Sequence, residues 1–178
     1  LGLESARQAV ASLKKGRRIE ELEQFALNDS MTGFYNRNAY DYFIYNEKNI
    51  KNYMVVTFDL NNLKMCNDNY GHSSGDAYII HSAHIIETTF DRFDKCYRIG
   101  GDEFCCLIPD AAEFQIERFI QKMQQDIAIL NNKNIIPTEV GIACGYALAT
   151  PDDADIEKVR ERADEMMYHN KKVLKGLI

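Results

Sequence analysis

Two short apolar runs in this chain are separated by a turn that predicts antiparallel pairing. Residues 96–99 (Cys-Tyr-Arg-Ile) and 104–108 (Phe-Cys-Cys-Leu-Ile) flank the tetrapeptide Gly100-Gly101-Asp102-Glu103. A double glycine between apolar runs of this length is typical of a β-hairpin. We therefore predict two neighbouring antiparallel strands with two carboxylates near the tip that joins them. The rest of the fold has to be built around a sheet that contains antiparallel pairs.

The remaining pattern predicts one further central strand, a later strand or strand pair, and several helices. We expect an apolar strand that ends on Asp59. In the long helix after the hairpin we expect the core residues Phe114, Phe119, Ile120, Met123, Ile127 and Leu130. The order β-α-β-β-α-β predicts an α+β fold, with a central, mostly antiparallel sheet flanked by helices. The expected helices cover residues 36–47, 60–68, 76–89, 111–131 and 155–175, and the expected strands cover 53–58 and 138–148.

The first 27 residues differ in composition from the rest of the chain. They are rich in Ala, Leu, Glu, Lys, Arg and Gln and contain no Pro, which predicts a helix. Its apolar spacing fits either a short parallel coiled coil or a solvated linker helix. We place an N-terminal linker helix at residues 1–27 and one globular domain at residues 28–178. Residue 1 is Leu rather than Met, so we expect a fragment whose sensory domain or membrane anchor lies upstream.

Composition narrows the class of protein. The 178 residues are 46% hydrophobic and carry a formal net charge of -6, which argues against disorder and against binding to nucleic acid or to a membrane surface. No apolar run approaches the roughly 20 residues that span a bilayer, so we expect a cytoplasmic domain. The five cysteines are an odd number and form no CxxC pair, which predicts reduced thiols rather than a disulfide framework or a structural zinc site.

Three polar stretches interrupt the apolar elements: Asp59, the segment 67–76, and the hairpin turn 100–103. Singly they fit a strand cap, a turn before a capped helix, and a solvated hairpin tip. If the strand that ends on Asp59 pairs with the hairpin, however, Asp59 lies beside Asp102 and Glu103. Clustered carboxylates repel each other unless a cation lies between them, and oxygen ligands without Cys or His suit Mg²⁺ or Mn²⁺. Such ions usually also bind substrate phosphates. The chain contains no P-loop, no serine-nucleophile elbow and no HExxH motif.

Four blocks of the sequence together resemble one family, the GGDEF domains or diguanylate cyclases. Asp29-Ser-Met-Thr-Gly-Phe-Tyr-Asn-Arg37 resembles the opening D-x-L-T-G-L-x-N-R, and Arg98-Ile-Gly-Gly-Asp-Glu-Phe104 contains the naming motif letter for letter. The stretch 58–76 resembles the family's central block, and Ala163-Asp164 with Tyr168 and Lys171 resembles its closing helix. The blocks occur in order at family spacing over residues 28–178, which is far more specific than a lone motif.

The resemblance implies a nucleotide-cyclase-like fold that condenses two GTP into cyclic di-GMP and two pyrophosphates at a metal-dependent dimer interface. It implies that Asp59, Asp102 and the backbone carbonyl of Leu60 hold two Mg²⁺ or Mn²⁺ ions. Either Asp102 or Glu103 accepts the proton of the attacking hydroxyl, and the sequence leaves this choice open. Lys64 matches a lysine that stabilises charge on the phosphates, although a buried salt-bridge lysine is the alternative.

The resemblance also implies which residues bind the nucleotide. Asn67 and Asp76 match a guanine-reading pair, because carboxylate and amide groups can satisfy the guanine edge. His72 lines the same pocket or is structural. Lys171 and Lys175 lie one helical turn apart, where the family places two phosphate-binding cations, although a solvated basic face fits them equally. The substrate-binding set implied for this chain is Asn62, Leu63, Asn67, His72, Asp76, Lys171 and Lys175. Arg37 and Arg98 are expected to be structural.

Two departures from the family pattern matter. Asn61 replaces a second acid found in many relatives, and the frame of the R-x-x-D product-inhibition site reads Asp91-Arg-Phe-Asp94. Asp91 would repel the phosphates of the product, so we expect tight product inhibition to be absent. We expect a homodimer with one GTP per subunit. The alternatives are a catalytically silent module that binds GTP and regulates an attached or partner domain, and a cyclase that makes a different dinucleotide, which Asp76 disfavours.

Overall fold

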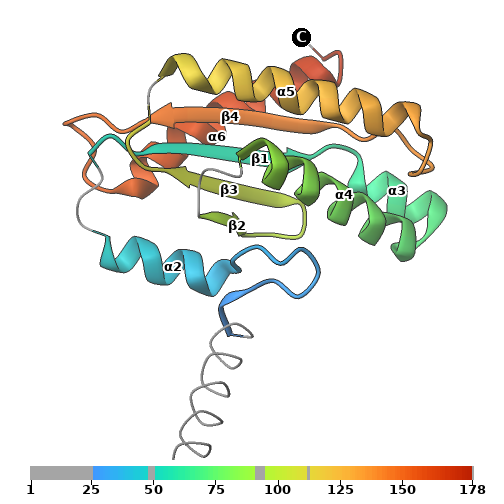
Figure 1. Ribbon diagram of the computed structural model, residues 1–178, viewed down its shortest axis with the longest axis horizontal. Coiled ribbons are helices and arrows are strands. Elements are labelled where there is room, and N and C mark those ends of the chain that lie inside the picture. Colours follow the sequence, from blue (N-terminus) through green and yellow to red (C-terminus); the bar gives the residue numbers. More distant parts are fainter. Residues whose placement is uncertain (1–25, 48–50, 91–94, 112, 178) are drawn as a thin grey trace, which may run out of the picture.

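The computed structural model describes residues 26–47, 51–90, 95–111 and 113–177. These residues form a four-stranded sheet in the order β2-β3-β1-β4, and all three neighbouring pairs are antiparallel. The α+β prediction is confirmed, with the strand that ends near Asp59 at the centre of the sheet (Figure 1). The strands are β1 (Met54–Leu60), β2 (Cys96–Arg98), β3 (Glu103–Ile108) and β4 (Ile142–Leu148).

Five described helices cover the two faces of this sheet. Helices α3, α4 and α5 pack on one face and α2 and α6 on the other, and each face has its own hydrophobic core (Figure 1). Side chains alternate along a strand, so Val56 and Phe58 face α4 and α5, whereas Val55 faces α2 and α6. The helices are α2 (Arg37–Asn46), α3 (Leu63–Tyr70), α4 (His72–Phe90), α5 (Glu113–Asn132) and α6 (Ile156–Leu174).

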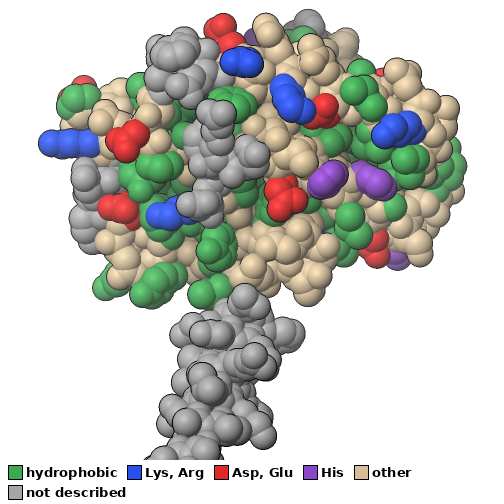
Figure 2. Space-filling view, in the orientation of Figure 1, with side chains coloured by type: hydrophobic (Ala, Val, Ile, Leu, Met, Phe, Trp, Pro, Cys, Tyr) green, Lys and Arg blue, Asp and Glu red, His purple; other side chains and the backbone are tan. Residues whose placement is uncertain are grey.

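Burial on both faces explains why β1 is apolar except for Thr57 and Asp59, and all of its residues are buried. On the neighbouring strand, Gly145 lets α6 pack directly on the sheet, because a Cβ atom there would overlap the backbone of Ala163 and Met167. On the face that Figure 2 shows, Lys and Arg side chains are scattered singly among polar and apolar ones. Within the described residues, no helix has both the length and the apolar character needed to cross a bilayer.

The segment between β1 and α4 departs from the prediction. The Gly-His-Ser-Ser-Gly stretch was expected to be a turn before the helix at residues 76–89. Helix α4 instead begins at His72, and only Gly71, with φ of 83°, separates it from α3. The Ser74 hydroxyl donates to the Tyr70 carbonyl at 3.1 Å, which supports this first turn. The preceding helix begins at Leu63 rather than at Leu60, because β1 continues through Leu60. Similarly, β4 begins only at Ile142.

The long helix α5 largely follows its predicted core. Met123 and Leu130 are buried, and Phe119, Ile120 and Ile127 are partly buried against the same cluster. The Phe114 side chain lies outside the described residues. So does almost all of the helix predicted for residues 1–27, and that prediction stays open.

The cysteines correct one expectation. Cys96 and Cys106 are direct partners across β2 and β3, with their Cα atoms 4.2 Å apart, and a disulfide joins them. Their spacing of ten residues does not reveal this pairing until the hairpin register is known. Cys66, Cys105 and Cys144 are free and buried, and burial raises the pKa of the Cys144 thiol to about 12, as expected for cysteines that act as small apolar residues.

Candidate functional site at the end of strand β1

The predicted meeting of carboxylates occurs where β1 ends. Asp59 faces Glu103 in the register of β1 and β3, and the Leu60 amide donates to the Asp102 carbonyl at 3.0 Å. Asp59 is 7% exposed, Asp102 is partly buried and Glu103 is exposed. A Cβ at Gly100 would lie 2.8 Å from the Glu103 carboxylate, so the glycine leaves room for this side chain. The sheet therefore places Asp59, Asp102 and Glu103 near one another at the end of β1.

The buried Asp59 has a cationic partner on α6. Lys171 Nζ lies 2.6 Å from Asp59 Oδ1, and the Lys171 side chain is only 25% exposed. This ion pair neutralises a carboxylate that would otherwise be buried without a partner, which is strongly unfavourable. Lys171 is therefore not part of a solvated basic face. Lys175, at the C-cap of α6, is exposed.

The proposed nucleotide-reading residues lie on α3 and α4, which Gly71 joins. Gly75 is buried in α4, and a Cβ there would overlap Asn67 Oδ1, so the Asn67 side chain lies directly against the turn of α4 that precedes Asp76. Asp76 and His72 are exposed and accessible to a ligand. The structure thus brings Asn67 and the start of α4 together.

Three further predicted residues follow β1. Lys64 is exposed on α3, so its alternative interpretation as a buried salt-bridge lysine is wrong. Asn62 is exposed in a left-handed conformation, with φ of 61°. Leu63 has a buried side chain, so only its backbone is available to a substrate.

The available donors fit a hard divalent cation. Asp59 and Asp102 supply carboxylate oxygens. The N–H and C=O of one strand residue point to the same side, so the Leu60 carbonyl faces the hairpin as its amide does. Oxygen donors of this kind suit Mg²⁺ or Mn²⁺. Among the described residues, no group of three or more His, Cys, Asp or Glu side chains is arranged to hold a metal.

A family model described as "Diguanylate cyclase, GGDEF domain" matches residues 26–175. The chain belongs to the GGDEF family. Its curated relatives include the diguanylate cyclase DgcS of Shewanella oneidensis, 27% identical over 85% of this chain and 52% of that protein. The diguanylate cyclase DgcN of Escherichia coli is 31% identical over 85% of this chain and 38% of that protein. The chain therefore spans about half or less of the length of these relatives.

A solved structure supports the fold of this GGDEF domain. The coiled coil and GGDEF domain of DgcB from Caulobacter crescentus, in complex with c-di-GMP, matches with a TM-score of 0.78. The match covers 94% of each chain at 23% sequence identity, which identifies the fold.

Arg98 of this GGDEF domain has the structural role that was predicted for it. Its guanidinium donates to Asp29 Oδ1 at 3.1 Å and to the Gly101 carbonyl at 2.8 Å, which ties the turn at residues 29–33 to the hairpin tip. Burial alone would raise the pKa of Asp29, but hydrogen bonds from Thr32 and Arg98 outweigh it and lower that pKa. Arg37, by contrast, forms an ion pair with Asp41 at the surface, 2.9 Å away.

Three residues, Asn61, Tyr78 and Gly141, lie where the end of β1 meets the start of β4. Of these the sequence singled out only Asn61, as the replacement of an acid. Asn61 is 5% exposed, and its Oδ1 has no hydrogen-bond partner in the described part of the chain. Its backbone amide donates to the Gly141 carbonyl, and its backbone carbonyl accepts a hydrogen bond from the Tyr78 hydroxyl. A cleft of about 890 Å³ between α5, β4 and α6 begins here and extends to Lys175. For Tyr78, the only signal in the sequence was a tyrosine on the apolar side of a helix, which is usually a core residue.

Proposed function

We propose that this GGDEF domain is a diguanylate cyclase, which condenses two GTP into cyclic di-GMP and releases two pyrophosphates. The observation that carries the proposal is the buried Asp59 at the end of β1, beside Asp102 and Glu103 and paired with Lys171. This is the charge pattern that a metal-bound triphosphate requires, because carboxylates hold the cation and lysines face the phosphates. The relatives named diguanylate cyclases support the same activity.

In this proposal Asp59, Asp102 and the Leu60 carbonyl hold two Mg²⁺ or Mn²⁺ ions. When bound, the ions neutralise the triphosphate and favour ionisation of the 3′-hydroxyl that attacks the α-phosphate. Asp102 or Glu103 accepts the proton of that hydroxyl. Lys171 neutralises Asp59 before substrate arrives and is then available to the terminal phosphates, together with Lys175.

Other residues of the same proposal bind and orient GTP. Asp76 accepts hydrogen bonds from N1–H and N2–H₂ of guanine, the Asn67 amide reads another edge position, and His72 lines the pocket. Adenine lacks this pair of donors, so Asp76 selects GTP over ATP. Lys64 stabilises charge on the phosphates, and the backbone at Asn62 and Leu63 contacts them.

Each site holds one GTP, so the reaction needs two copies of the domain facing each other as a homodimer. The N-terminal segment would bring the copies together and connect them to an upstream sensory domain.

We further propose that tight product inhibition is absent, because Asp91 stands where the family has arginine. Residues 91–94 lie outside the described part of the chain. Sub-micromolar, non-competitive inhibition by cyclic di-GMP that Asp94→Ala abolishes would contradict this.

The test is to incubate the domain at high concentration with GTP and Mg²⁺, or Mn²⁺ separately, and to resolve the products by mass spectrometry. We expect cyclic di-GMP from the wild type and none from Asp102→Asn. The Glu103→Gln variant separates the two possible proton acceptors: if Glu103 is the acceptor, this variant still binds the metal but does not turn over. GTP bound tightly by a forced dimer without any product would instead support the silent regulatory module.

A further inference from the structure

The residue pair that follows the last ladder pair of β1 and β4 has only one of its two direct backbone hydrogen bonds among the described residues. Leu60 faces Ile142 in the register, so the next pair is Asn61 with Gly141. In an antiparallel ladder such a pair exchanges two N–H···O=C bonds. One of them is present, because the Asn61 amide donates to the Gly141 carbonyl at 2.8 Å. The Tyr78 hydroxyl replaces the other.

This hydroxyl lies between the two strands. The Gly141 amide donates to Tyr78 Oη at 2.7 Å, and Tyr78 Oη donates to the Asn61 carbonyl at 2.7 Å, with the Gly141 carbonyl also near at 3.1 Å. Tyr78 is 0% exposed, and burial raises its pKa to about 12, so the hydroxyl keeps the proton that it donates. Glycine at 141 leaves room for the Asn61 side chain, since a Cβ there would lie 3.3 Å from Asn61 Nδ2.

The hydrogen bonds of Tyr78 with Asn61 and Gly141 connect two parts of the proposed site. Asn61 directly follows Asp59 and Leu60, and Tyr78 lies on α4, two residues after Asp76. One hydroxyl therefore joins α4, which carries Asp76, to the end of β1, which carries the proposed metal ligands Asp59 and Leu60. Nothing else in the described residues bonds the Asn61 carbonyl.

We propose that Tyr78 is a positioning residue for metal binding, whose hydroxyl holds the β1 end open so that Asp59 and the Leu60 carbonyl face the hairpin carboxylates. This inference rests on the proposed function. A tyrosine that only filled the core would need its ring but not its hydroxyl. The hydroxyl instead satisfies two backbone groups, the Gly141 amide and the Asn61 carbonyl, at the point where the strand leaves the sheet. A displacement of even 1 Å there can lower a rate by up to about a hundredfold.

The test is Tyr78→Phe, which removes one oxygen and keeps the ring. We expect kcat to fall roughly tenfold and the apparent affinity for Mn²⁺ to fall severalfold, while KM for GTP and the preference for GTP over ATP stay unchanged. Mn²⁺ affinity is measured by electron paramagnetic resonance with an unreactive GTP analogue, so this readout does not require turnover. In the metal-free protein, the amide NMR signals of Leu60, Asn61 and Gly141 should shift.

Tyr40→Phe is the matched control. Tyr40 is equally buried, at 1% exposure, and its hydroxyl donates to Glu157 at 2.7 Å on the opposite face of the sheet. Both variants should lose similar stability, but only Tyr78→Phe should change Mn²⁺ affinity. Equal Mn²⁺ affinity and kcat in the two variants would overturn the inference. If the wild type makes no cyclic di-GMP, the proposed function fails, whereas the comparison of Mn²⁺ affinities still decides the role of Tyr78.

Discussion

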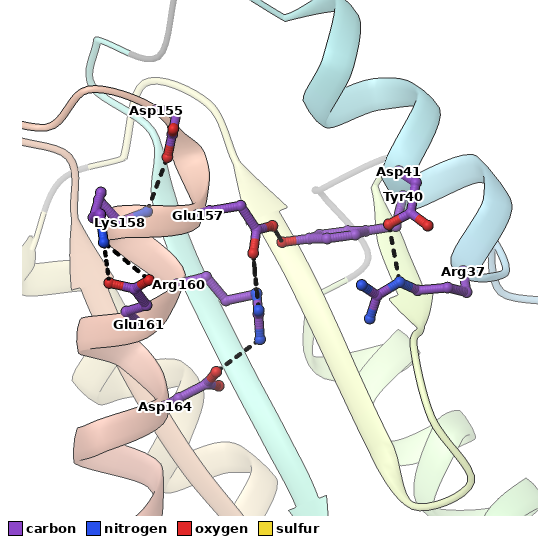
Figure 3. A network of polar contacts seen from close by, with 9 residues as sticks. All are labelled: Arg37, Tyr40, Asp41, Asp155, Glu157, Lys158, Arg160, Glu161 and Asp164. Carbon is purple, nitrogen blue, oxygen red and sulfur yellow. Dashed lines mark hydrogen bonds and ion pairs between the residues drawn. The ribbon is translucent and has the colours of Figure 1, made fainter.

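The two ends of α6 use charge in opposite ways. Near its start, Arg160 bonds both Glu157 and Asp164, at 2.8 and 2.7 Å, and Glu157 also accepts the Tyr40 hydroxyl from α2 (Figure 3). Near its end, Lys171 forms an ion pair with Asp59, and Lys175, which lines the cleft, is exposed to solvent. At the start of α6 the charged groups bond one another in a closed network, whereas at its end Lys175 is exposed and available to a ligand.

The difference shows what each end is built for. In the closed network the acids and the guanidinium satisfy one another, and this fixes α2 and α6 on the same face of the sheet. Burial disfavours the charge of Glu157, but hydrogen bonds from Arg160 and Tyr40 outweigh it and lower its pKa. Burial dominates at Asp164 and raises its pKa despite Arg160. The open end keeps its polar groups available to a ligand, so we expect substitutions there to affect activity more than stability.

The largest effect is expected from Asp59→Asn. It removes a metal ligand and leaves Lys171 without its anionic partner, so formation of cyclic di-GMP should fall on the order of a thousandfold or more. The melting temperature should change little, because Lys171 can turn to solvent. Activity assays and thermal unfolding of the same preparation test both statements. Unchanged turnover would place the metal site elsewhere.

Gly75→Ala should separate binding from stability. Alanine favours a helix interior over glycine by about 1 kcal/mol, so the variant should be no less stable. The new Cβ displaces the Asn67 side chain, however, and GTP affinity measured by calorimetry should fall about tenfold, as for loss of one hydrogen bond to a ligand. Because both changes act through one side chain, the double variant with Asn67→Ala should bind no more weakly than Asn67→Ala alone. Additive losses would show that Gly75 acts by another route.

Arg160→Met should have the opposite profile. It keeps the aliphatic packing but leaves Glu157 and Asp164 half-buried without their cation, so the free energy of unfolding should fall by about 2 kcal/mol. Turnover per folded molecule should stay at the wild-type level, because the network does not contact the proposed nucleotide site. Denaturant unfolding and activity at saturating GTP are the two measurements. A loss of kcat in fully folded protein would contradict the separation of the two ends.

A smaller effect is expected in the pH dependence of stability. The folded-state pKa of Glu157 lies below its ordinary value of 4.5, so its contribution is present above that value and is lost as pH falls through the folded-state pKa. Asp164, with a raised pKa, acts in the opposite direction and partly offsets it. Glu157→Gln should therefore flatten the acid side of the stability curve. An unchanged slope below pH 4.5 would show that Glu157 is not coupled to Arg160 in solution.

The sequence predicted those features that depend on short-range chemistry. The hairpin followed from two glycines between apolar runs, and the carboxylate cluster followed from the way that β1 pairs with that hairpin. The start of α4 was mispredicted, because Gly75 was taken as a loop residue. It lies within the helix, where its missing side chain leaves room for Asn67. The Cys96–Cys106 disulfide, the ion pair of Lys171 with Asp59 and the hydroxyl of Tyr78 depend on register and on helix docking. No local pattern encodes those.

The most direct test of the account is to follow GTP turnover by phosphorus NMR with Mg²⁺ at two protein concentrations. We predict cyclic di-GMP and pyrophosphate in a one-to-two ratio, with a rate per subunit that rises with protein concentration because two sites must meet. Release of inorganic phosphate, pyrophosphate without cyclic product, or a rate independent of concentration in a demonstrated monomer would contradict it.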